Sequence, residues 1–200
     1  MLDCFYGGFM SKIGLRSAKQ DGLALRYIKN QALEACLEAV KEHGRALKYV
    51  KDQTEEICLE AVKQNGWALQ FVHGQTENIC LEAVKQNERA LDCVHSQTEE
   101  MCLMAIKKSA WALELVHNQT YEMCLEAVRQ DGTALQFVRN QTEEICLEAV
   151  RERAEALEYV KDQTLSICLA AAKKSRSKAL EQIVDPAMVR QVIEILDTRT

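Results

Sequence analysis

The chain has 200 residues, and its 30 acidic and 25 basic side chains give a net charge of −5, which disfavours bulk nucleic-acid binding. Apolar residues make up 48% and charged residues 28%, a balance typical of a folded protein rather than a disordered tail. One proline and eight glycines provide few tight turns, which argues against a β-sandwich or barrel, and no apolar run reaches the roughly 18 residues of a membrane-spanning helix.

One unit is copied along the sequence. Seven of the nine cysteines lie at a constant step of 22 residues, and the residues around them repeat in phase: Cys36, Cys58, Cys80, Cys102, Cys124, Cys146 and Cys168. The clearest copy runs from Gln53 to Gly74, a weaker copy runs from Phe9 to Asn30, and the last copy has one extra residue near Ser177. Self-similarity at a short fixed period is typical of a solenoid.

Each copy is predicted to hold two short helices. Thr54 is placed to N-cap the first helix, which buries a stripe formed by Ile57, Cys58, Ala61 and Val62. We expect Asn65-Gly66 to supply the left-handed residue that ends this helix. The second helix, at about 67–73, buries Ala68, Leu69 and Val72. Helices this short are unstable alone, so each unit must stack on its neighbours.

The predicted fold is therefore an all-α solenoid of short antiparallel helix pairs. The repeat array is expected over residues 11–184, after an N-terminal cap segment at 1–10. Asp185-Pro186 is typical of the start of a helix, and residues 185–200 are predicted to form a C-terminal capping helix. A homodimer contact through the apolar face of that helix is the alternative.

The repeated Gln-Thr-x-Glu-Ile-Cys-Leu-x-Ala-Val-Lys-Gln-Asn-Gly-x-Ala-Leu-x-x-Val resembles the repeats grouped as domain of unknown function 4116. The resemblance covers about residues 11–184, and its Ala-Val-Lys-Gln-Asn-Gly-x-Ala-Leu core is specific. It implies a helical repeat and no assigned activity.

The cysteines and histidines do not predict a metal site or a cofactor. The cysteines that recur in phase lie on the buried stripe, where a free thiol acts as a small hydrophobe, and no Cys-x-x-Cys pair exists. Cys93 and Cys4 are the more reactive candidates. His73, His95 and His117 occupy one position in three copies, which one zinc ion cannot easily span. A pH-dependent partner contact through these histidines is kept as a hypothesis.

A lysine or arginine, such as Lys63, occurs near the end of the first helix in every copy, and together these residues form a basic column. Such a column would suit a single-stranded RNA or DNA backbone, with one unit per nucleotide. A nucleic-acid binder would also use a second basic column, at the histidine position, which other copies fill with Lys29, Lys51, Arg139 and Lys161. A glutamate three residues earlier, as at Glu60, pairs with the first column in most copies and favours a neutralised, solvated surface. Nucleic-acid binding is therefore the alternative rather than the main prediction.

The recurring glutamines that precede the capping threonines are predicted to form a structural ladder between units: Gln53, Gln75, Gln97, Gln119, Gln141 and Gln163. The sequence contains no glycine-rich phosphate loop, nucleophile elbow or acid–base pair outside the repeated pattern. We therefore expect a protein without enzymatic activity.

The columns that vary between copies are the candidates for recognition, because the shared positions build the stack. At the start of the second helix the candidates are Arg45, Trp67, Arg89 and Trp111, which are residue types enriched at binding hot spots. Three positions later they are Lys48, Gln70, Asp92 and Glu114, a series that runs from basic to acidic. The alternative for the two tryptophans is that they only cover adjacent helix corners.

The predicted function is a protein-binding module whose partner, another protein, is read by the outer face of the second helices, with His73, His95 and His117 at its edge. The opening residues, with Asp3 and no long apolar stretch, predict no secretory signal. The expected location is a reducing, cytoplasmic compartment, that of a host cell if the protein is delivered there.

Overall fold

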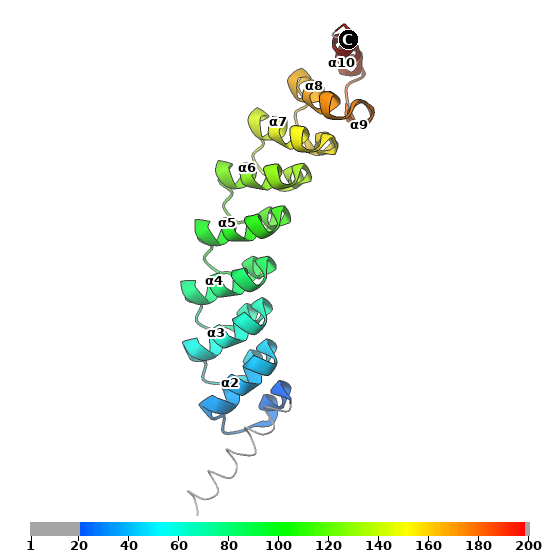
Figure 1. Ribbon diagram of the computed structural model, residues 1–200. Coiled ribbons are helices and arrows are strands. Elements are labelled where there is room, and N and C mark those ends of the chain that lie inside the picture. The colour runs from blue at the N-terminus through cyan, green and yellow to red at the C-terminus, as the bar shows by residue number, and fades with distance from the viewer. Residues whose placement is uncertain (1–20, 199–200) are drawn as a thin grey trace, which may run out of the picture. The chain divides into compact units, whose positions relative to one another are not determined.

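The computed structural model describes residues 21–198, and this part of the chain contains helices and no strand (Figure 1). The first helices of the copies are α-helices of ten residues each: α2 (Leu33–Glu42), α3 (Glu55–Gln64), α4 (Glu77–Gln86), α5 (Glu99–Lys108), α6 (Tyr121–Gln130), α7 (Glu143–Glu152) and α8 (Leu165–Lys174). The prediction of an all-α helical repeat is confirmed. None of the described helices combines the length and apolar character needed to cross a bilayer.

The second helices of most copies are 3₁₀-helices of six residues. They are η1 (Gly22–Tyr27), η2 (Gly44–Tyr49), η3 (Gly66–Phe71), η4 (Glu88–Cys93), η5 (Ala110–Leu115), η6 (Gly132–Phe137) and η7 (Ala154–Tyr159). The second helix predicted at about 67–73 therefore begins one residue earlier, ends sooner and is wound more tightly than an α-helix. A 3₁₀-helix longer than about four residues is uncommon, so these elements depend on their packing.

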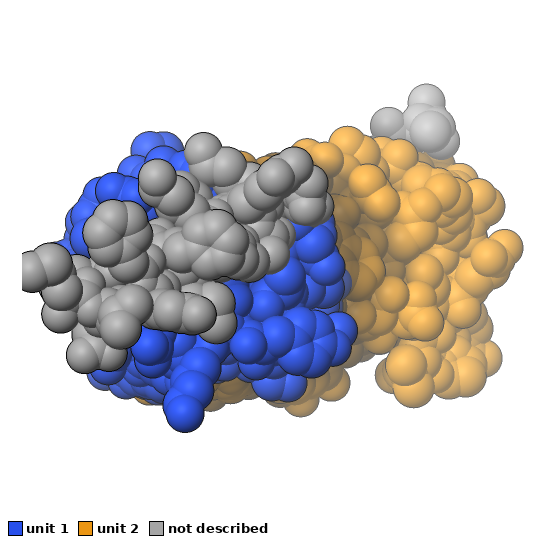
Figure 2. Space-filling model, turned by 90° about the horizontal axis from the view of Figure 1, so that it is seen from below, with its two compact units in different colours: residues 1–104 blue, residues 105–200 orange. Residues whose placement is uncertain are grey.

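The chain forms two compact units, residues 1–104 and residues 105–200, which Figure 2 colours separately. The division falls within α5, inside the predicted 11–184 array. The N-terminal cap segment predicted at 1–10 lies outside the described residues.

Consecutive copies stack within each unit. In unit 1, α2 packs on α3 and α3 on α4, while η1, η2, η3 and η4 pack in series. In unit 2 the same order joins α6, α7 and α8, and η5, η6 and η7. The buried positions are the predicted ones: Ile57, Cys58, Ala61, Val62, Ala68, Leu69 and Val72 in the clearest copy. Thr54 caps α3 as predicted, since its hydroxyl accepts a hydrogen bond from the Ile57 backbone N–H.

The glycine before the second helix does not end the first helix in a left-handed conformation, so this prediction was wrong. No described glycine has a positive φ, and Asn65 is extended and caps η3 through its side chain. Gly66 is instead the first residue of η3, where its backbone approaches the next copy. A Cβ added there would lie 2.6 Å from the carbonyl oxygen of Ala83. Glycine is therefore suited to this position because it allows a close approach.

The recurring glutamines bridge consecutive copies, as the ladder interpretation requires. The Nε2 of Gln53 donates to the carbonyl of Phe71, at 2.8 Å, and to that of Leu47, at 3.4 Å. Its Oε1 accepts from the backbone N–H of His73, at 3.0 Å, and from the Sγ of Cys58, at 3.7 Å. The full set of four bonds also occurs at Gln31, Gln119 and Gln141. Each side chain thus joins the C-terminal ends of two neighbouring 3₁₀-helices.

A second column of glutamines, which the sequence analysis did not identify, bridges the opposite ends of these helices. The Oε1 of Gln64 accepts from the backbone N–H of Gly44 at 2.7 Å, and its Nε2 donates to the carbonyl of Glu42 at 3.2 Å. Gln86 accepts in the same way from Gly66 at 2.7 Å. These contacts satisfy backbone groups that a helix end leaves without an intrahelical partner.

The chain ends in two α-helices, α9 (Arg176–Gln182) and α10 (Pro186–Asp197). Asp185 caps α10 by accepting from Ala187 at 2.8 Å, and the proline occupies the first turn, as the sequence predicted. α10 packs on α8, Val192 is fully buried, and the Arg176 guanidinium lies 2.7 Å from the carboxylate of Asp197.

Replacing an interior ladder glutamine should destabilise the protein. Gln141→Ala leaves the Tyr159 carbonyl and the Lys161 N–H without their side-chain partner. The Tyr159 carbonyl is only partly buried and the Lys161 N–H is exposed, so the loss is expected to be about 1 kcal/mol, read as a lower melting temperature in thermal unfolding followed by circular dichroism. Gln136→Ala is the control, because Gln136 is exposed and its side chain donates within its own turn, to the Thr133 carbonyl. Equal melting temperatures for the two variants would contradict the structural role of the ladder.

Gly66→Ala should lower the free energy of unfolding by about 1–3 kcal/mol, the usual cost of overpacking, because the new methyl group forces apart the backbones of η3 and α4. Gly74→Ala is the matched control, since an added Cβ at Gly74 meets no atom within 4 Å. Urea unfolding of both variants measures the difference, and an unchanged midpoint for Gly66→Ala would show that this approach is not tight.

Candidate functional site

The predicted recognition residues lie at the second and fifth positions of the 3₁₀-helices, on the side that the stack leaves open. Arg45, Lys48, Gln70, Arg89, Asp92, Trp111 and Glu114 are exposed, and Trp67 is half-buried. We call these outer positions, together with the partly exposed residue that ends each 3₁₀-helix, the outer face of the second helices. Because the two compact units are separate, the face is described for each unit in turn.

In unit 1 the outer face pairs cations with aromatic rings. The guanidinium of Arg26 lies 4.6 Å from the ring centroid of Tyr27, which is 76% exposed. Arg45 lies 6.0 Å from the Phe71 ring of the next copy, and Lys48 lies 6.0 Å from the ring of its neighbour Tyr49. Such contacts hold a cation over the ring while its outer side remains open to solvent.

In unit 2 the indole of Trp111 is partly packed and partly free. It meets the ring of Phe137 in the next copy edge to face, with 5.3 Å between centroids and 65° between planes. Half of its surface is still exposed. The interpretation that this tryptophan covers an adjacent helix therefore describes one side of the ring, and the other side is available for a ligand.

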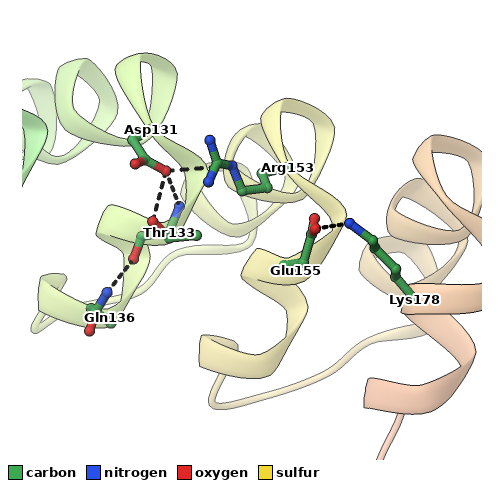
Figure 3. Close-up of polar contacts among 6 residues, drawn as sticks. All are labelled: Asp131, Thr133, Gln136, Arg153, Glu155 and Lys178. Atoms are coloured by element: carbon green, nitrogen blue, oxygen red, sulfur yellow. Dashed lines mark hydrogen bonds and ion pairs between the residues drawn. The ribbon is translucent and has the colours of Figure 1, made fainter.

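Polar contacts connect the starts of the second helices in unit 2, as Figure 3 shows. The Asp131 carboxylate accepts from the backbone and the hydroxyl of Thr133, at 3.0 and 2.7 Å, and lies 3.7 Å from the Arg153 guanidinium. Glu155 pairs with Lys178 of α9. Burial would raise the pKa of Asp131, but the hydrogen bonds from Thr133 and the charge of Arg153 lower it below its ordinary value. The carboxylates of Asp131 and Glu155 thus form ion pairs with cations of the following copy.

The histidines lie just beyond the 3₁₀-helices, and all three are exposed: His73, His95 and His117. The backbone N–H of His73 donates to the Gln53 ladder. At the equivalent position in another copy, Arg139 donates to the carbonyls of His117 and Val116 in the preceding copy. Where this position carries an arginine, as at Arg139, its side chain connects neighbouring copies. The described residues contain no group of three His, Cys, Asp or Glu side chains that could hold a metal ion.

Carboxylates partly neutralise the basic column on the first helices. Lys63 lies 3.1 Å from Glu60, and Lys85 lies 3.2 Å from Glu82. Glu148 lies 3.8 Å from Arg151 on its own helix, and also accepts from Arg129 of the preceding copy at 3.1 Å. In these copies the expected pairing at a spacing of three residues is present, which weakens the argument for a nucleic-acid groove.

An open hollow of about 550 Å³ lies between α7 and α8, and the sequence analysis did not identify it. Its apolar lining is Leu147, Leu169 and Ala170, with the cations Arg151, Lys173 and Lys174 and the hydroxyl of Ser166 around them. The sequence contains an indication of this hollow, because α8 has no acidic residue in its first turn and alanine replaces the usual glutamate at position 170.

The cysteines that recur in phase are buried free thiols from Cys36 to Cys168, and Cys93 is half-buried. Burial raises the pKa of each of these eight thiols, so few are in the reactive thiolate form at neutral pH. Cys4 lies outside the described residues. Cys93, the other cysteine expected to be reactive, is the most accessible of the described thiols, but its raised pKa does not favour the thiolate.

Timed alkylation of the native protein with N-ethylmaleimide should modify Cys93 before the seven buried thiols, because Cys93 is half-buried and therefore more accessible to the reagent. Peptide mass spectrometry measures each rate, and urea provides the control in which all sites react. Since its raised pKa keeps the Cys93 thiol protonated, its rate should still increase with pH above 9. Equal native rates at Cys58 and Cys93 would show that the array opens faster than the reagent attacks.

The comparisons with known proteins agree with this repeat structure. The model of the family described as "Domain of unknown function (DUF4116)" matches at residues 33–75, 54–97 and 120–165, more than half of the chain. Neither a curated protein nor a solved structure matches the chain. The matched segments begin and end within the copies that the structure shows as an α-helix followed by a 3₁₀-helix. The chain therefore belongs to the DUF4116 family of helical repeats.

Proposed function

We propose that this protein is a non-enzymatic binding module that recognises another protein through the outer face of its second helices. One observation carries the proposal: bulky side chains stand at outer positions where the stack does not need them. Thr133 fills the same position in η6 as Trp67 in η3 and Trp111 in η5, and η6 packs on its neighbours all the same. Binding is therefore a better reason than stacking for the two indoles.

The shared polar side chains support a module without catalysis. The glutamine ladder and the threonine caps use their hydrogen-bonding groups on the backbone of their own or the adjacent copy. Recognition is then left to the varying positions: Arg45, Lys48, Trp67, Gln70, Arg89, Asp92, Trp111 and Glu114. The buried free thiols are consistent with the reducing, cytoplasmic location proposed for the protein.

The two alternatives use other surfaces. Single-stranded nucleic acid would bind along the basic column of the first helices, where glutamates neutralise several of the cations. A homodimer through α10 would need an apolar face that is partly occupied by α8, since Val192 is fully buried and Met188 lies against Cys168. The following experiment can distinguish nucleic-acid binding and homodimer formation from the proposed function.

The proposal is tested by a pull-down from a nuclease-treated lysate, read by mass spectrometry, with wild type beside Trp67→Ala/Trp111→Ala. We expect proteins that wild type retains and that the folded variant loses; such a protein, once purified, should bind wild type directly and the variant at least tenfold more weakly. Leu33→Ala/Tyr121→Ala is the matched control, because these exposed apolar residues lie on the first helices.

Three results would contradict the proposal. Identical protein lists from wild type and the tryptophan variant would assign the indoles to packing. Retention of nucleic acid in an untreated lysate, with no protein after nuclease, would favour the nucleic-acid alternative. A concentration-dependent mass of the pure protein, with no partner captured, would favour the homodimer.

A further inference from the structure

The outer surface of η1, η2 and η3 has a charge pattern that differs from the rest of the array. These three helices contain three cations and no carboxylate, and four aromatic residues accompany them. We call this set the cationic surface: Arg26, Tyr27, Arg45, Lys48, Tyr49, Trp67 and Phe71. In unit 2 the corresponding helices η5, η6 and η7 contain three carboxylates, Glu114, Glu155 and Glu158, and no cation.

The cations of this surface are not neutralised within the described protein. Arg26, Arg45 and Lys48 contact aromatic rings and form no ion pair with a described carboxylate, unlike Lys63 and Lys85 on the first helices. A ring beneath a guanidinium restricts its movement and leaves its N–H edge free to donate. The surface therefore presents fixed donors that lack an anionic partner, at a low entropic cost of binding.

The order of side chains limits the class of partner. In η1 the fifth position is Arg26 and the second is Leu23, and in η2 both outer positions carry cations. In η3 the outer face carries Trp67, Gln70 and Phe71, so the cations end before it and the surface becomes mainly apolar. A nucleic-acid strand carries a charge on every nucleotide, so a phosphate-tracking surface would need cations to continue onto η3. A protein segment with a short acidic run followed by apolar residues matches the observed order.

We propose that the cationic surface of unit 1 binds an acidic segment of a protein partner, with carboxylates at Arg26, Arg45 and Lys48 and the adjoining apolar side chains on Trp67 and Phe71. This assignment rests on the proposed protein-binding function and names the chemistry of the partner. Bidentate bonds from the two arginines to carboxylates, and desolvation of the indole, provide the affinity.

The test uses the full chain and a fluorescein-labelled synthetic peptide in which a run of glutamates precedes a run of leucines. Fluorescence anisotropy should show saturable binding that weakens as salt is raised, and Arg45→Glu/Lys48→Glu should weaken it by roughly tenfold or more. Lys63→Glu/Lys85→Glu is the matched control, because it makes the same change of charge on the first helices and should leave the affinity within twofold of wild type.

A second readout places the peptide. Trp111→Phe leaves Trp67 as the single tryptophan, and the emission of this variant should change on adding unlabelled peptide. Trp67→Phe leaves Trp111 in unit 2, and its emission should remain constant. This pair separates binding at the cationic surface from charge attraction spread over the protein.

Several results would overturn the assignment. They are equal affinities for wild type and Arg45→Glu/Lys48→Glu, no change in Trp67 emission, or tighter binding of oligodeoxythymidine that the same double variant abolishes. The last result would make the surface a nucleic-acid site. Failure here is distinct from failure of the proposed function, because the lysate pull-down assumes no partner chemistry and also depends on Trp111.

Discussion

The side-chain amide of the ladder glutamine is the contact on which the array depends. In Gln53 both amide hydrogens and the carbonyl oxygen are used, on backbone groups at the ends of η2 and η3 and on the thiol of Cys58. A 3₁₀-helix of six residues is longer than this winding usually persists without support, and its last carbonyls have no intrahelical partner. The glutamine supplies that partner across the boundary between copies, so that each copy is completed by the next. The Cys58 thiol has two roles as a result, since it fills the core and donates weakly to the same oxygen.

Those features of the fold that depend on one copy could be predicted from the sequence. The threonine caps, the buried stripe and the period all follow from residues that are close in the chain, as at Thr54 and Cys58. The 3₁₀ winding could not, because Ala68 and Leu69 would be buried in either kind of helix. The role of Gly66 depends on how near the Ala83 carbonyl lies, which no local pattern contains. The contacts of Arg45 with Phe71 and of Trp111 with Phe137 likewise join residues of different copies.

The outer face shows how one side chain can serve both packing and recognition. Trp111 touches Phe137 on one side and remains half exposed on the other, so the stack holds the indole in place without covering it. A ligand that covers such a fixed ring loses less entropy than one that must first order it. The candidate residues could be identified from sequence because they vary while their neighbours repeat. Their pairing with rings could not, since it depends on the register of one copy against the next.

The last copy indicates that the spacing of buried residues, rather than helix type, is what the stack requires. In η3 the N–H of the buried Ala68 donates to Asn65, three residues back, whereas in α9 the buried Ala179 donates to Ser175, four residues back. The extra residue near Ser177 therefore converts a 3₁₀-helix into an α-helix and still brings the alanine into the core. Gln163 makes its usual contacts with the end of α9, through the Gln182 carbonyl and the Val184 N–H. Because the ladder is preserved while the helix changes, the stack tolerates an α-helix in place of a 3₁₀-helix at this position.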